Sequence, residues 1–124
     1  MSTVISKHRA KAIAEISVVI GILEIMPVSN SKLANLKVKE SKQELEEVKD
    51  FIFNDEKPLD MYDKLEVQAI ISLNTVKTSL NNSFGKPFNG NEEQVKRYDE
   101  LKPSIEKIFL SIDSAINHLS ASKG

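Results

Sequence analysis

The sequence predicts an all-α protein, an antiparallel up-down-up-down bundle of four helices whose last helix is kinked near Pro103. Apolar residues recur at spacings of three and four in each of four segments, and this is the spacing of one helix face. Three short breaks that contain proline, glycine or asparagine separate the segments. Short connections favour antiparallel neighbours. We expect residues 1–119 to form one domain and residues 120–124 to form a frayed tail.

The composition is that of an ordinary globular protein, with 40% apolar and 28% charged residues, which argues against a disordered chain. The chain contains no cysteine, so disulfides, thiolate catalysis and zinc–cysteine sites are excluded. The net charge of −1 gives no support to a nucleic-acid or anionic-membrane partner. The apolar stretch at residues 12–26 includes two glutamates and is shorter than the roughly 20 apolar residues that span a bilayer. We expect a cytoplasmic protein.

The first helix is predicted over residues 4–26, ending before Pro27. Its second half is apolar on almost every side, so the helix is either central in the core or covered by a second subunit. One stripe is made of small residues that let another backbone approach closely: Ala10, Ala14, Ser17 and Gly21. The stripe beside it is made of large residues: Ile13, Ile16, Ile20 and Leu23. We predict self-association, most simply as a dimer. The interface residues are predicted to be Ala14, Ser17, Ile20, Gly21 and Leu23.

The second helix is predicted to end near Phe53, and its narrow apolar seam resembles that of a coiled coil. The residues of this seam are Ala34, Val38, Ser41, Leu45, Val48 and Ile52. The third helix is predicted to begin at Asp60 as the N-cap, with Asp63 in its first turn, where a carboxylate meets the positive end of the helix dipole. Its buried side is predicted to contain Met61, Tyr62, Leu65, Ala69, Leu73, Val76 and Leu80.

The longest break is predicted over residues 81–91 and contains Phe84 and Phe88. Two aromatic residues in a polar loop either fix the loop to the core or form an exposed anchor for a partner. Asn91 and Gln94 have the spacing of a capping box that opens the last helix. The apolar stripe of this helix continues through Pro103, which predicts one kinked helix in place of two. The stripe contains Val95, Tyr98, Leu101, Ile105, Ile108, Ile112, Ala115 or Ile116, and Leu119.

Two carboxylate pairs with a spacing of three residues are the first candidate for chemistry. Glu44 and Glu47 share one face of the second helix, and Asp60 and Asp63 open the third. Four carboxylates on facing helices suit Mg²⁺. The arrangement resembles the all-α nucleoside-triphosphate pyrophosphohydrolases of the MazG type, which pair Glu-x-x-Glu on one helix with Glu-x-x-Asp on the next. Asp60 stands where that family has Glu, and a solvated charged face plus an N-cap explains the same residues.

The two histidines are the second candidate. His8, Lys11 and Ala12 look like the phosphoacceptor helix of histidine phosphotransfer domains, although those domains place helices ahead of that motif and only seven residues precede His8. The exposed, basic first turn of a helix is the simpler explanation of these residues. His118 and His8 lie at opposite ends of the chain, and such ends can meet in a bundle. No nucleophile turn or glycine-rich oxyanion loop accompanies them.

The sequence is therefore interpreted as that of a small, non-catalytic protein that binds another macromolecule, in the manner of a regulatory, inhibitor, immunity or accessory-subunit protein. We expect a protein partner, contacted by Phe84 and Phe88, and no cofactor or metal. The alternative is a magnesium-dependent pyrophosphohydrolase that uses Glu44, Glu47, Asp60 and Asp63.

Overall fold

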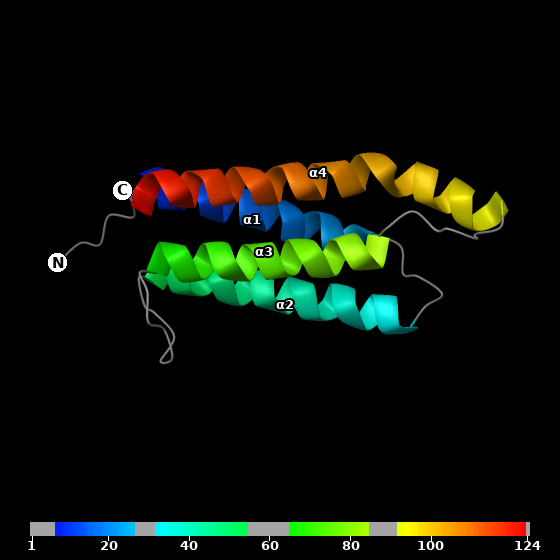
Figure 1. Cartoon of the computed structure of the whole chain (residues 1–124), viewed down its shortest axis with the longest axis horizontal. Coiled ribbons are helices and arrows are strands. Elements are labelled where there is room, and N and C mark those ends of the chain that lie inside the picture. The colour runs from blue at the N-terminus through cyan, green and yellow to red at the C-terminus, as the bar shows by residue number, and fades with distance from the viewer. Residues whose placement is uncertain (1–6, 27–31, 55–64, 85–91, 124) are drawn as a thin grey trace.

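The computed structural model describes residues 7–26, 32–54, 65–84 and 92–123, and within these ranges the protein consists of four α-helices without a strand (Figure 1). The helices are α1 (Lys7–Ile25), α2 (Lys32–Asn54), α3 (Leu65–Phe84) and α4 (Glu92–Lys123). The predicted all-α four-helix bundle is confirmed.

Each helix packs against two others, so the four helices form a closed ring in the order α1, α2, α3, α4. In Figure 1 the chain reverses direction between successive helices, and the start of α1 lies beside the end of α4. We call the end of the bundle that holds these two segments the terminal end. The other end, where α1 finishes and α2 begins, is called the distal end.

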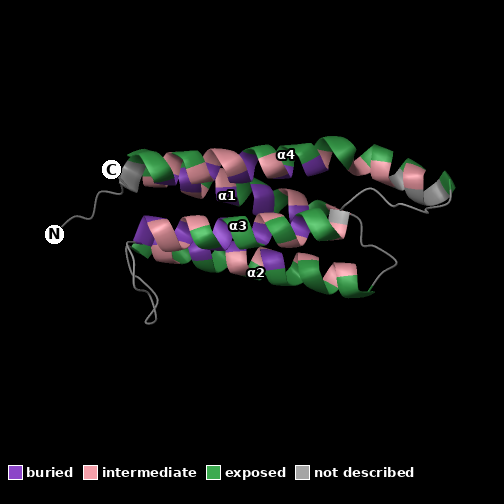
Figure 2. Ribbon diagram, in the orientation of Figure 1, coloured by how far each residue is buried: buried purple, intermediate pink, exposed green. Residues whose placement is uncertain are grey.

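One apolar core runs through the bundle, and every helix contributes a stripe to it (Figure 2). Leu45 of α2, Leu73 of α3 and Ile112 of α4 are almost completely buried. Full burial of side chains of this size contributes about 1.5–3 kcal/mol each. The stripes predicted for α2, α3 and α4 supply most of this core: Leu45, Val48, Ile52, Leu65, Ala69, Leu73, Val76, Leu80, Ile105, Ile108, Ile112, Ala115 and Leu119.

Helix α1 buries its large stripe and exposes its small one. Ile16, Ile20 and Leu23 lie in the core together with Ala12 and Val19, while Ile13 is half-buried. The outward side carries exposed small residues, namely Ala10, Ala14, Ser17 and Gly21. Because α1 is apolar on almost every side, it has a buried side of large residues and also an exposed strip of small, uncharged residues.

Helix α4 is one helix of 32 residues that passes through Pro103, as its uninterrupted stripe predicts. Its first turns extend beyond the other helices in Figure 1. The predicted core residues Val95, Tyr98 and Leu101 are accordingly only half-buried, whereas Ile105 and Ile108 are buried. Pro103 thus lies where α4 leaves the bundle. The kink at this proline stays a prediction.

Helix α3 extends further at its C-terminal end than the sequence predicts. Residues 81–84 are helical and do not belong to the break predicted to begin at Asn81. From the sequence alone, the polar residues of this last turn favour the end of the helix. In the structure, buried Leu80 holds the turn against the core. The hydroxyl of Ser83 donates a hydrogen bond to the carbonyl of Ser79, which satisfies it within the helix. The predicted caps Asp60 and Asn91 lie outside the described residues.

None of the four helices described is long and apolar enough to cross a membrane.

Ser111 provides a test of the core. Its side chain is 1% exposed, and its hydroxyl oxygen has no hydrogen-bond partner. A buried polar group without a partner costs about 1–3 kcal/mol. The substitution Ser111→Ala is therefore expected to raise the free energy of unfolding by about 1 kcal/mol or more, measured by denaturant titration. Ser120→Ala, at an exposed position of the same helix, is the control and is expected to change little. A destabilised Ser111→Ala variant would show that this hydroxyl has a partner.

Candidate functional site

The two histidines of the chain meet at the terminal end. His8 lies in the first turn of α1 and His118 near the end of α4, and their ring centres are 6.3 Å apart with the ring planes inclined by 32°. His8 is exposed and His118 is half-buried. The fold therefore brings together two imidazoles from opposite ends of the sequence.

An ion pair crosses the bundle at the same end. Nε of Arg9 donates a hydrogen bond of 2.7 Å to Oε1 of Glu66, and Nη2 of Arg9 contacts the same oxygen. The pair joins α1 to α3, whose backbones do not adjoin in the ring. Its side chains are 20% and 9% exposed, so the pair is largely removed from water. Glu66 also lies in the first turn of α3, where the helix dipole favours a carboxylate. Arg9 and Glu66 thus link the two diagonal helices at this end.

A groove of about 730 Å³ lies between α2 and α3 at the distal end. It is lined by Leu33, Ala34, Lys37, Thr75, Thr78, Ser79, Asn82 and Ser83. The hydroxyls of Thr75 and Thr78 donate hydrogen bonds to the carbonyls of the residues four positions earlier in α3. These hydroxyls are satisfied within the helix, and their oxygens still have capacity to accept a hydrogen bond. An occupant of the groove would therefore leave these two donors satisfied within α3.

Three large apolar side chains are exposed at this same distal end. Ile25 ends α1 and is 82% exposed, while Leu33 and Leu36 in the first turns of α2 are 65% and 50% exposed. Single exposed apolar residues are common on protein surfaces, whereas a group of them marks a contact surface more often. Leu33 lines the groove, and Leu36 is three residues further along the helix, a spacing that makes the two side chains neighbours.

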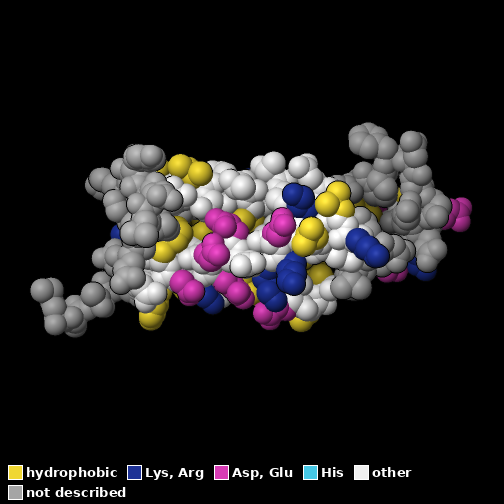
Figure 3. All heavy atoms as spheres, turned by 90° about the horizontal axis from the view of Figure 1, so that it is seen from below, with side chains coloured by type: hydrophobic (Ala, Val, Ile, Leu, Met, Phe, Trp, Pro, Cys, Tyr) yellow, Lys and Arg dark blue, Asp and Glu magenta, His cyan; other side chains and the backbone are white. Residues whose placement is uncertain are grey.

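The surface of α2 changes charge along its length. Figure 3 looks onto the side of the bundle where α2 lies, with lysines gathered toward the distal end and most acidic residues toward the terminal end. The exposed lysines of the first half are Lys32, Lys37 and Lys39, and the exposed acids of the second half are Glu46, Glu47 and Asp50. The first turn of α2 contains no acidic residue to offset the positive end of its dipole. Of these exposed lysines, Lys37 lines the groove, and its ammonium lies 4.0 Å from the carboxylate of exposed Glu40.

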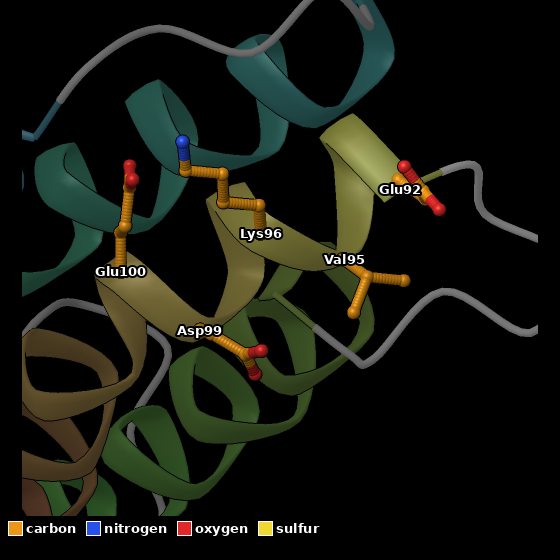
Figure 4. A pocket seen from close by; sticks show the side chains of 5 residues that line it. All are labelled: Glu92, Val95, Lys96, Asp99 and Glu100. Carbon is orange, nitrogen blue, oxygen red and sulfur yellow. The ribbon is translucent and has the colours of Figure 1, made fainter.

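A second depression, of about 590 Å³, lies against the first turns of α4. All five side chains that line it come from this one helix (Figure 4). Lys96 and Glu100 project to one side of the helix, and Asp99 points away from them. Among the side chains that the structure describes, the carboxylates of Glu92, Asp99 and Glu100 point in different directions and do not converge on a common point.

The carboxylates of the predicted magnesium site are only partly within the described chain. Glu44 is half-buried and Glu47 is exposed on α2, whereas Asp60 and Asp63 lie outside the described residues. Among the residues that the structure describes, no group of three or more His, Asp or Glu side chains is placed to hold a metal ion. The pyrophosphohydrolase alternative stays a prediction.

The residues predicted for self-association divide between two environments. Ile20 and Leu23 lie in the core of the single chain, at 7% and 5% exposure. Ala14, Ser17 and Gly21 are exposed on the outward side of α1, and a Cβ atom added at Gly21 would meet nothing within 4 Å. A second copy would therefore contact the small residues. Self-association itself stays a prediction.

Of the two predicted partner-binding residues, Phe84 is the last residue of α3, and Phe88 lies outside the described residues. Phe84 directly follows Asn82 and Ser83, which line the groove. Sequence analysis did not single out Leu33 or Leu36. The signal was present, because the predicted seam of α2 runs through Ala34 and Val38 and leaves both leucines off the buried stripe.

No protein-family model, curated protein or solved structure matches this chain.

Removing the carboxylate of the ion pair is expected to destabilise the bundle. Glu66→Ala leaves the guanidinium of Arg9 partly buried without this partner, at an expected cost of about 1–3 kcal/mol in the free energy of unfolding. Glu40→Ala is the matched control, because the contact of Glu40 with Lys37 spans 4.0 Å and both side chains are at least half exposed. Exposed pairs of this kind contribute about 0–1 kcal/mol. Equal effects of the two substitutions, in urea titrations, would contradict a structural role for Glu66.

Substitutions of Gly21 test the role of the exposed strip of α1. Glycine inside a helix is less favourable than alanine by about 0.5–1 kcal/mol, and the space around Gly21 is open in the single chain. Gly21→Ala is therefore expected to raise the free energy of unfolding by about that amount. Gly21→Leu should preserve the fold and, if two copies pack through this strip, lower the mass measured by light scattering. An unchanged mass would count against an interface at Gly21.

Proposed function

We propose that this protein acts by binding another protein and catalyses no reaction itself, in the manner of a regulatory, inhibitor, immunity or accessory-subunit protein. The observation that carries the proposal is the exposure of Leu33, which lines the groove between α2 and α3, and of Leu36, its neighbour on α2. Exposed leucines on a helix that has a complete buried stripe of its own do not serve the core of the single chain.

The energetics favour a contact at this position. Full burial of a leucine side chain contributes about 1.5–3 kcal/mol, and Leu33 and Leu36 together leave much of that gain unrealised. A groove between two helices accepts a third helix that lays its apolar side into it. The two leucines would contact apolar residues of such a helix, while the satisfied hydroxyls of α3 form the opposite wall.

The charge around the groove indicates the chemistry of the partner segment. Lys37 lines the groove, and Lys32 and Lys39 are exposed nearby on α2. Charge complementarity raises the rate of association and disfavours wrong partners. We therefore propose that the partner presents an amphipathic helix whose apolar side is flanked by acidic residues. Phe84, at the end of α3, is a proposed further contact, as is Phe88.

The test compares three immobilised forms of the protein in extracts of the cells that produce it. They are the native chain, the double variant Leu33→Ser/Leu36→Ser, and the control Leu110→Ser, which replaces a leucine that is 66% exposed on α4. A true partner is expected to be retained by the native chain and by the control. The double variant should bind the purified partner at least about tenfold more weakly, because loss of 1.4 kcal/mol already has that effect.

Two further measurements make the result decisive. Circular dichroism and thermal unfolding should show that all three forms are equally folded. Lys37→Glu should weaken binding at low salt more than at high salt, because exposed charges are screened. Retention of the same proteins in equal amounts by all three forms would refute the groove as the binding surface.

A further inference from the structure

We propose that His8 and His118 together form a binding site for a divalent transition-metal ion such as Zn²⁺, which joins the first turn of α1 to the end of α4. This site lies at the terminal end, away from the groove of the proposed function, and does not depend on that function.

The two rings lie near the separation that a shared ion requires. Zinc binds an imidazole nitrogen at about 2.0–2.1 Å with tetrahedral geometry, so two imidazoles that share one ion have ring centres on the order of 5–5.5 Å apart. The ring centres of His8 and His118 are 6.3 Å apart. Binding would therefore draw the two rings closer together by about 1 Å, through rotation of their side-chain bonds.

The backbone on both sides of the pair is held by the core. Ala12 lies one turn after His8, and Ala115 lies three residues before His118; both alanines are fully buried. Small buried residues let two helices approach closely, which accounts for the contact between rings from different helices. Leu119, directly after His118, is also fully buried. Ligands carried by packed helices are positioned more accurately than ligands on loops.

The donor set selects the class of ion. Two neutral imidazoles favour Zn²⁺, Ni²⁺ or Cu²⁺, whereas Mg²⁺ and Ca²⁺ require oxygen ligands. No group of three or more His, Asp or Glu side chains is placed to hold a metal in the described part of the chain. The described residues therefore contribute two ligands, and water can occupy the remaining coordination positions. A site of this kind links two helices and leaves positions open for exchange.

The experiment uses the full chain without an affinity tag, since tags carry histidines. Zn²⁺ is titrated while the NMR resonances of the histidine rings are recorded, and thermal unfolding is followed with and without Zn²⁺. The chain contains two histidines in all, so both can be followed separately. We expect one ion per chain, simultaneous shifts of both ring resonances, and a rise of the unfolding temperature with Zn²⁺ but not with Mg²⁺.

The variants His8→Asn and His118→Asn each remove one ligand and are expected to weaken Zn²⁺ binding at least tenfold. Lys11→Asn, at an exposed position one turn from His8, is the matched control and should bind as the native chain does. Unfolding without metal establishes that each variant is folded. If a variant fails to fold, the shifts of the two histidine ring resonances in the native chain decide whether both histidines bind Zn²⁺. Zn²⁺ that shifts neither ring, shifts one ring alone, or binds the histidine variants as tightly as the native chain would overturn the proposal.

Discussion

Burial of one apolar stripe from each of the four helices is the interaction on which the rest of this structure depends. No disulfide supports the fold, because the chain contains no cysteine. The free energy of folding must therefore come mainly from the removal of apolar surface from water. Core residues such as Leu45, Leu73 and Ile112 belong to one continuous cluster, so each helix is stable only in the presence of the others.

The core sets the order of the four helices in the ring. As a result, the two ends of the bundle carry different kinds of side chain. The terminal end contains the polar contacts between helices distant in sequence, namely the ion pair of Arg9 with Glu66 and the ring contact of His8 with His118. The distal end carries exposed leucines, lysines and the groove between α2 and α3. The two ends of the bundle therefore differ, with polar contacts between helices at the terminal end and exposed apolar side chains at the distal end.

Much of this organisation follows from residue spacing. The seam of α2 and the stripes of α3 and α4 predicted their buried residues, since a spacing of three and four leaves little choice of helix face. The same spacing failed at the end of α3, because the polar residues 81–83 suit a break as well as a helix. The residues predicted for self-association on α1 divide between the core and the exposed surface. Ile20 and Leu23 lie in the single-chain core, and only the position of the neighbouring helices distinguishes a core side from an interface side.

The candidate sites depend on tertiary structure to a greater degree. By itself, the sequence determined the fold class, the number of helices and nearly all of the core, because these follow from local periodicity and from the breaks between helices. Only the tertiary structure decided that His8 lies against His118, that Arg9 reaches Glu66, and that α2 and α3 leave a groove beside Leu33. Those features depend on how far each helix extends along its neighbours and which side it turns to them. The packing of all four helices together sets both quantities, and no single segment encodes them.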